Sequence, residues 1–191
     1  MSYVYLSLAD PAVGRHLQNG AVGVMPTDTV YGLVCSAGNK MAVKRLYDLK
    51  RREHKPGTII ASDIQQLIGL GIKPRYLKAV EHYWPAAISV VIPCGSELAY
   101  IHLGENSVPV RVSADKTLNM LINHVGPLVT TSANAPGKPT ANTLKEAQAY
   151  FGNKVDFYVD GGDLSDRQPS TIIRIADDAI EVLREGAVEV G

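Results

Sequence analysis

The chain has 191 residues, of which 46% are hydrophobic and 20% are charged, and its 19 Lys and Arg balance 19 Asp and Glu. This composition predicts one compact soluble domain over residues 1–191 and excludes a disordered tail, a coiled coil and a globally basic nucleic-acid coat. Two cysteines without a metal-ligand spacing, together with no export leader and no apolar run of about 18 residues, favour the cytoplasm over secretion or a membrane.

Short β-branched runs predict strands along the whole chain. The runs cover residues 21–25, 58–61, 88–92, 108–112, 128–131, 155–159 and 171–175. A last run at 180–183 follows after residues 176–179, and this spacing predicts a hairpin with a four-residue loop.

Apolar stripes and helix-boundary residues predict helices between these strands. Two capping boxes, Ser62–Gln65 and Thr143–Glu146, mark helix starts. The predicted helices cover residues 41–50, a short segment from 62, a segment begun by Pro74, 115–125 closed by Gly126, and a segment from 143 that ends at Gly152. The alternation predicts an α/β fold with a single twisted mixed β-sheet and flanking helices.

A dense group of cations lies at the end of the first predicted helix, within residues 44–55. Cations at a helix C-terminus are favoured by the helix dipole, so one interpretation is a solvated cap. The group is larger than a cap needs, and its members repel one another unless an anion is bound. Lys50 and Arg52, where the helix frays, could therefore hold a polyphosphate.

Small polar residues follow two of the predicted strands, at 27–29 and 130–134, and precede a third, at 168–171. Hydroxyls and backbone N–H groups at strand ends can bind phosphate or carboxylate, but ordinary turns have the same composition. Arg111 interrupts an apolar strand and either clamps a carboxylate or faces water. Arg184 either joins a site or forms a surface ion pair with Glu181 or Asp178. Neither common nucleotide loop occurs in the sequence.

Taken in order, these segments resemble the YrdC-like family of threonylcarbamoyl-AMP synthases, over about residues 10–187. The resemblance is carried by Pro26 to Leu33, by Lys50-Arg51-Arg52 with Ser132-Ala133-Asn134, and by Trp84-Pro85, Val110-Arg111-Val112, Pro169-Ser170-Thr171-Ile172 and Leu183-Arg184-Glu185-Gly186. It implies the family's concave, positively charged cavity. It also implies the short type without a further C-terminal domain.

The resemblance implies an enzyme that combines L-threonine, bicarbonate and ATP into threonylcarbamoyl-AMP and pyrophosphate, with Mg²⁺. A separate transferase complex would then use the product on tRNA. Lys50 and Arg52 would be the catalytic cations. The implied ATP-binding residues are Lys50, Arg52, Asn134 and Arg184, with Ser107 and Asn142 as weaker candidates, and the implied threonine-binding residues are Thr27, Arg111, Ser132 and Ser170.

The sequence departs from the family pattern at Glu53, at Ala86-Ala87 and at Arg174. Glu53 would weaken the cationic group and Arg174 would add positive charge. Two other functions stay open. The chain could be a module that binds double-stranded RNA or tRNA without this catalysis, or a paralogous enzyme that makes another carbamoyl-adenylate.

Overall fold

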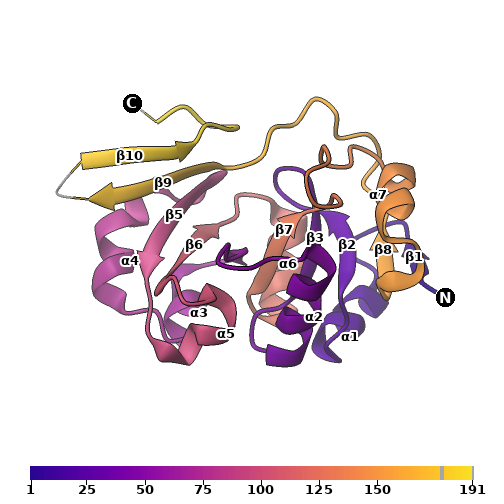
Figure 1. The fold of residues 1–191 in the computed structure, drawn as a ribbon, viewed down its shortest axis with the longest axis horizontal. Helices are drawn as coiled ribbons and strands as arrows, with labels where there is room; N and C mark the ends of the chain where they lie inside the picture. Colours follow the sequence, from indigo (N-terminus) through magenta and orange to yellow (C-terminus); the bar gives the residue numbers. More distant parts are fainter. Residues whose placement is uncertain (177–178, 191) are drawn as a thin grey trace.

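The computed structural model describes residues 1–176 and 179–190, which form a ten-stranded mixed sheet (Figure 1). Its strand order is β1-β8-β2-β3-β7-β4-β6-β5-β9-β10, with β1 at one end and the hairpin β9–β10 at the other. The strands are β1 Tyr3–Tyr5, β2 Gly23–Pro26, β3 Tyr31–Ser36, β4 Thr58–Ala61, β5 Ile88–Pro93, β6 Ser107–Val112, β7 Leu128–Ser132, β8 Phe157–Val159, β9 Thr171–Ala176 and β10 Ala179–Arg184.

Helices cover both faces of the central strands. They are α1 Pro11–Gln18, α2 Lys40–Lys50, α3 Ile64–Gly69, α4 Pro74–Val80, α5 Ala99–His102, α6 Lys116–Val125 and α7 Leu144–Phe151, with single 3₁₀ turns at Glu81–Tyr83, Ser96–Leu98 and Gly152–Lys154. Helices α1 and α6 enclose a smaller core on one face. The other helices enclose the main core on the opposite face.

The alternation of side chains along each strand produces these two cores. In β3, Leu33 and Cys35 belong to the main core, whereas Val34 between them belongs to the smaller core. In β4, Ile59 and Ile60 divide in the same way. Strands with two covered faces are apolar throughout, and this explains why the predicted runs were continuous rather than alternating.

The predicted α/β fold with a single mixed sheet is confirmed, and its errors are local. The prediction omitted β1, α1, the separate strand β3 and the four-residue helix α5. The first capping box lies one residue later than predicted: Asp63 accepts the Gln66 N–H at 2.9 Å, and Gln66 Oε1 accepts the Ser62 N–H at 3.1 Å. Asp63 rather than Ser62 caps the helix, because a carboxylate accepts a hydrogen bond from a helix N–H more strongly than a serine hydroxyl does.

The hairpin is confirmed, but its strands extend further than predicted, since Ala176 pairs with Ala179. The rest of the predicted loop, residues 177 and 178, lies outside the described residues. No helix within residues 1–176 and 179–190 is long and apolar enough to cross a bilayer.

Candidate functional site

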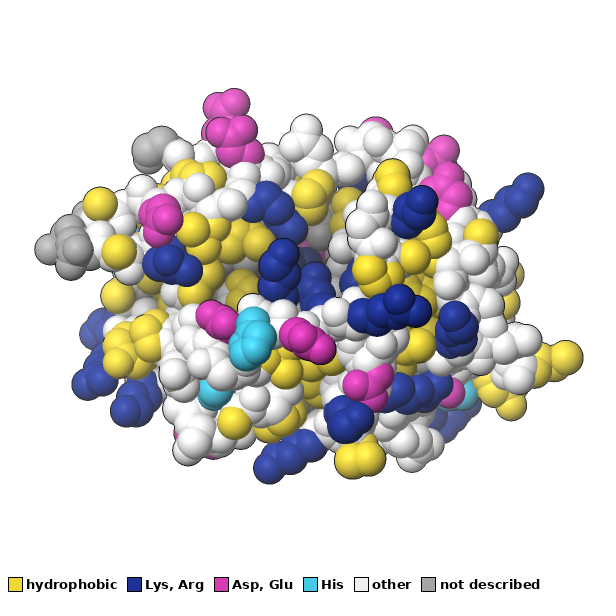
Figure 2. All heavy atoms as spheres, viewed as in Figure 1, with side chains coloured by type: hydrophobic (Ala, Val, Ile, Leu, Met, Phe, Trp, Pro, Cys, Tyr) yellow, Lys and Arg dark blue, Asp and Glu magenta, His cyan; other side chains and the backbone are white. Residues whose placement is uncertain are grey.

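A cavity lies where the polar ends of several strands meet, and we call it the arginine cavity. Its volume is about 100 Å³, and its lining residues include Arg52, Arg111 and Arg184 but no Asp or Glu among the described ones. Figure 2 shows Lys and Arg side chains gathered around a hollow in this face. The other lining residues are Thr27, Thr29, Val30, Tyr31, Gly32, Pro56, Thr58, Pro109, Thr130, Thr131, Ser132, Pro169, Ser170 and Ile172.

A second hollow of about 970 Å³ shares Thr29 with the arginine cavity, and we call it the large cavity. Its walls are residues 166–168, Thr171, Val182 and residues 185–190, with Asp28 beside Thr29. Because ligand sites typically need about 300–1,000 Å³, a nucleotide would have to extend beyond the arginine cavity.

Arg111 is buried on β6, where its side chain is only 3% exposed, and it pairs with Asp28, whose side chain is 6% exposed. Its Nη2 donates to Asp28 Oδ1 at 2.6 Å and its Nε donates to Asp28 Oδ2 at 3.0 Å. Its Nη1 lies 3.5 Å from Ser89 Oγ. The possibility that Arg111 faces water is therefore wrong. The guanidinium does line the cavity, with Nη1 as the nitrogen that Asp28 does not hold.

Arg184, at the end of β10, lies against Ser170. Its Nε donates to Ser170 O at 3.1 Å and its Nη2 donates to Ser170 Oγ at 3.1 Å. Ser170 Oγ lies 2.9 Å from Ser89 Oγ, so a chain of polar contacts joins Arg184 to Arg111. Burial lowers the pKa of Arg184, and the nearby charges of Arg111 and Arg52 lower it further.

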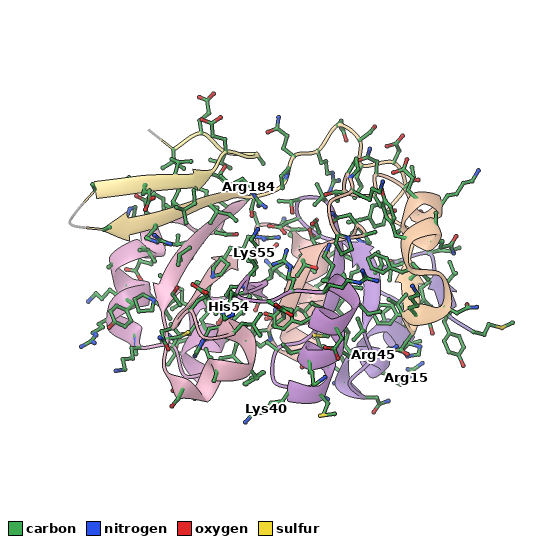
Figure 3. The ribbon with its side chains drawn as sticks, in the orientation of Figure 1. Arg15, Lys40, Arg45, His54, Lys55 and Arg184 are labelled. Carbon is green, nitrogen blue, oxygen red and sulfur yellow. The ribbon has the colours of Figure 1, made fainter. Side chains whose placement is uncertain are left out.

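Arg52, Arg111 and Arg184 all line the arginine cavity, so their positive charges repel one another, and a bound anion would relieve this repulsion. The predicted surface pair between Arg184 and Glu181 is wrong, because Glu181 pairs with Arg174 at 3.5 Å. The other predicted partner, Asp178, lies outside the described residues. In the view of Figure 3, Arg184 from β10 and Lys55 from the loop after α2 both point toward the central hollow.

Lys50 is the last residue of α2, and the helix ends there without fraying because Arg51 adopts the left-handed conformation at φ 47°. Lys50 is 6% exposed, and its Nζ donates to Ser132 O at 2.9 Å and to the backbone and side-chain oxygens of Asn134, both at 2.7 Å. Burial, and then the charge of Arg52, lowers its pKa to about 8. Lys50 therefore ties α2 to the loop after β7.

Arg52 follows this turn and lines the arginine cavity. Its Nη1 donates to the backbone oxygens of Lys55 and Pro56, both at 3.0 Å. Burial lowers its pKa. These bonds fix the guanidinium in the loop, and its other nitrogens can still receive a ligand.

The predicted hydroxyls also lie at the cavity. Thr27 Oγ1 donates to Val30 O at 2.8 Å and accepts the Thr29 N–H at 3.2 Å, so the polar-turn interpretation holds as well. Ser132 Oγ donates to Asn134 Oδ1 at 2.7 Å, and its lone pairs remain available as acceptors. Asn134 Nδ2 donates to Lys138 O at 2.6 Å.

Four of the predicted residues, Lys50, Ser107, Asn134 and Asn142, are not among those that line the arginine cavity. Ser107 begins β6, whereas Arg111 lies near the end of the same strand, and Ser107 Oγ is 3.4 Å from Glu105 O. Asn142 precedes α7, and its backbone N–H donates to Glu146 Oε2 at 2.8 Å. The arginine cavity therefore brings together Thr27, Arg52, Arg111, Ser132, Ser170 and Arg184, with Lys50 and Asn134 bonded to its Ser132 edge.

Sequence reasoning did not identify Asp28, Ser89 or Tyr31 as parts of the site. Asp28 was visible as the carboxylate between Thr27 and Thr29, but nothing in the sequence links it to Arg111. Tyr31 lines the cavity, and its hydroxyl holds the loop at 161–162 by accepting the Gly161 N–H at 2.7 Å and donating to Gly162 O at 2.9 Å.

Comparison with known proteins decides the family. The Sua5_yciO_yrdC family model, described as telomere recombination, matches residues 15–186. The chain belongs to the Sua5/YciO/YrdC family. The resemblance drawn from the sequence motifs is therefore confirmed.

Curated relatives support this membership. The putative threonylcarbamoyl-AMP synthase of Methanocaldococcus jannaschii is 30% identical over 92% of this chain and 84% of that relative. The threonylcarbamoyl-AMP synthase of Coxiella burnetii is 36% identical over 76% of this chain and 81% of that relative.

Solved members of the Sua5/YciO/YrdC family have the same fold. P. abyssi Sua5 complexed with L-threonine matches with a TM-score of 0.83 and 25% identity, over 97% of this chain and 57% of that protein. The chain thus spans little more than half the length of Sua5.

Proposed function

We propose that this member of the Sua5/YciO/YrdC family is a threonylcarbamoyl-AMP synthase, a nucleotidyltransferase that makes threonylcarbamoyl-AMP and pyrophosphate from L-threonine, bicarbonate and ATP. The observation that carries the proposal is the convergence of Arg52, Arg111 and Arg184 with hydroxyls on one cavity, in a chain similar to proteins of that name. An anionic amino acid group and a triphosphate both fit such a surface.

L-Threonine would bind through its carboxylate. The Nη1 of Arg111 is the nitrogen best placed to donate to it, since Asp28 holds the other two. Ser170 Oγ, Ser132 Oγ and Thr27 would orient the rest of the amino acid. The amine then attacks the carbon derived from bicarbonate, the new C–N bond forms with loss of water, and a carbamate results.

The carbamate oxygen would then attack the α-phosphorus of ATP, forming a new O–P bond while the bond to pyrophosphate breaks. Negative charge grows on the departing pyrophosphate, where Arg52 and Arg184 act and where Lys50 can act by exchanging one of its oxygen partners. Asn134 would support the nucleotide, with Ser107 and Asn142 as outlying candidates. Each charge-assisted contact contributes about 1.5–3 kcal/mol.

The described residues do not offer a Mg²⁺ site of their own. They contain no group of three or more His, Cys, Asp and Glu placed to hold a metal, and Asp28, which lies between the cavity-lining Thr27 and Thr29, is held by Arg111. Mg²⁺ would therefore be bound mainly by the triphosphate.

The proposal extends to the cytoplasm, to a transferase complex that consumes the product, and to tRNA as the final acceptor. RNA binding by the chain itself would be independent of the synthase reaction. It would act through exposed cations such as Lys55, and its affinity would fall steeply with salt.

The test measures pyrophosphate release from ATP with each substrate omitted in turn and without RNA. Release should require both L-threonine and bicarbonate, and L-serine should replace L-threonine poorly. Release that ignores threonine, or that needs RNA, would refute the proposal in favour of the other two functions.

A matched pair of variants locates the activity. Arg184→Met should lower kcat/KM for ATP by about ten- to a hundredfold. Arg174→Met, on the same hairpin, removes an exposed ion pair with Glu181 and should leave kcat/KM unchanged. Equal effects of the two changes would contradict the assignment of Arg184.

A further inference from the structure

Residues 186–190, which we call the strap, fold back along residues 169–171. The Ala187 N–H donates to Pro169 O at 2.9 Å. Thr171 Oγ1 donates to Val188 O at 2.5 Å and lies 3.2 Å from the Val188 N–H. Val188 and Val190 also pack against the main core. The strap is thus attached to one short segment by several different contacts.

Gly186 is required for this close approach. A Cβ atom on residue 186 would collide with Pro169 O and would lie 2.6 Å from Ser170 C and 2.7 Å from Thr171 N. All three are backbone atoms, which cannot rotate aside as a side chain can. Any other residue at position 186 must therefore push the strap away from residues 169–171.

The segment that the strap holds carries Ser170. On its other side, Ser170 Oγ contacts Ser89 Oγ at 2.9 Å, and the Thr171 N–H donates to Ala87 O at 3.0 Å. Arg184, two residues before Gly186, binds both the backbone oxygen and the hydroxyl of Ser170. A shift of the strap therefore moves two side chains of the arginine cavity together.

We propose that the strap positions Ser170 and Arg184 in the arginine cavity, and that Gly186 and Thr171 are the positioning residues through which it acts. Both line the large cavity rather than the arginine cavity, so they influence the reaction through their neighbours. The proposal rests on the proposed function for the identity of the substrates, and the geometry of the strap is independent of it.

The experiment compares two variants with two matched controls. Gly186→Ala introduces the collision, and Thr171→Val removes the hydroxyl that binds Val188 while keeping the side-chain shape. Gly38→Ala is the control for the first, because its Cβ would meet only Ser36 Oγ at 4.0 Å. Thr171→Ser is the control for the second, because it keeps the hydroxyl.

The readout is the split between KM and kcat for pyrophosphate release. Ser170 and Arg184 would bind the substrates, so displacing them weakens contacts of about 1.5–3 kcal/mol each, and Gly186→Ala should raise the KM for L-threonine roughly ten- to a hundredfold. Thr171→Val should raise it in the same direction, and both controls should match the wild type. A variant that is merely less stable has fewer active molecules, which lowers kcat and leaves KM unchanged.

An unchanged KM in Gly186→Ala and Thr171→Val would overturn the proposal, and Thr171→Val alone decides if Gly186→Ala does not fold. Calorimetry with inorganic pyrophosphate gives a readout without catalysis, in which both variants should bind more weakly than their controls. Absence of threonine-dependent release in the wild type would refute the proposed function alone. Equal pyrophosphate affinity in variants and controls would then refute the positioning role of the strap.

Discussion

The buried pair of Asp28 and Arg111 leads to a quantitative prediction for Asp28→Asn. The substitution keeps the size of the side chain but leaves the Arg111 guanidinium, 3% exposed, without its counter-charge. Removing one partner of a buried pair typically lowers the free energy of unfolding by about 3–5 kcal/mol. Because an asparagine oxygen can still accept one hydrogen bond, we expect the lower end, about 3 kcal/mol.

For a chain of this size, about 3 kcal/mol corresponds to a fall in melting temperature of roughly 6–12 °C. Urea denaturation gives the free energy directly, provided the slope stays the same as in the wild type. Asp48→Asn is the matched control, because the Lys44–Asp48 pair has side chains that are 69% and 65% exposed. Its loss should be within about 0.5 kcal/mol.

The double variant Asp28→Asn with Arg111→Gln separates the pair from its surroundings. Without the buried charge, the asparagine no longer leaves a cation uncompensated, so the double variant should be more stable than the sum of the two single losses predicts. A loss of less than about 1 kcal/mol in Asp28→Asn would refute the reasoning. It would mean that water reaches the guanidinium.

Three further predictions concern neighbouring polar groups. Since burial lowers the pKa of Lys50 from 10.5 to about 8, kcat/KM for ATP should fall above pH 8 and stay flat in Lys50→Arg. Between pH 8 and 10.5, Lys50 is protonated in the unfolded chain but mostly neutral in the folded one. The free energy of unfolding should therefore rise with pH over this range, and urea denaturation at each pH measures it. Asn134→Ala removes an acceptor of Lys50 and should lower the free energy of unfolding by about 1–3 kcal/mol, whereas Asn134→Asp should not. Tyr31→Phe leaves Gly161 N–H and Gly162 O without their partner, and thermal melting should show a loss of about 1–3 kcal/mol.

Most of the fold was predictable because its signals are local. The run at 58–61 is β4 without change, and Gly126 ends α6 as expected. The omitted helix α1 carried a readable signal, since Asp10 caps it and Pro11 opens it. The omitted strand β1 has three residues and depends on pairing with β8, more than 150 residues later, so no local pattern could reveal it.

The site was predictable as a set of residues but not as a geometry. The motifs named six residues that line the arginine cavity, whereas Lys50, Ser107, Asn134 and Asn142 do not line it. They did not show that Asp28 already occupies two nitrogens of Arg111, because 83 residues separate the two in the sequence. They also left open whether Lys50 was a solvated cap or a phosphate ligand at a fraying helix end, whereas the left-handed turn at Arg51 leaves it buried against three oxygens. The Asp28–Arg111 pair and the burial of Lys50 both depend on contacts between segments that are far apart in the sequence.

The arginine cavity draws its walls from Thr27 near one end of the chain and from Arg184 near the other. A ribosome must therefore translate through residue 184 before the third cation can join the first two. Until then, a growing polypeptide carries Arg52 and Arg111 without the segment that completes their enclosure. Closure of the arginine cavity therefore comes only after synthesis through residue 184, and a ligand held by all three arginines could not assist the earlier stages of folding.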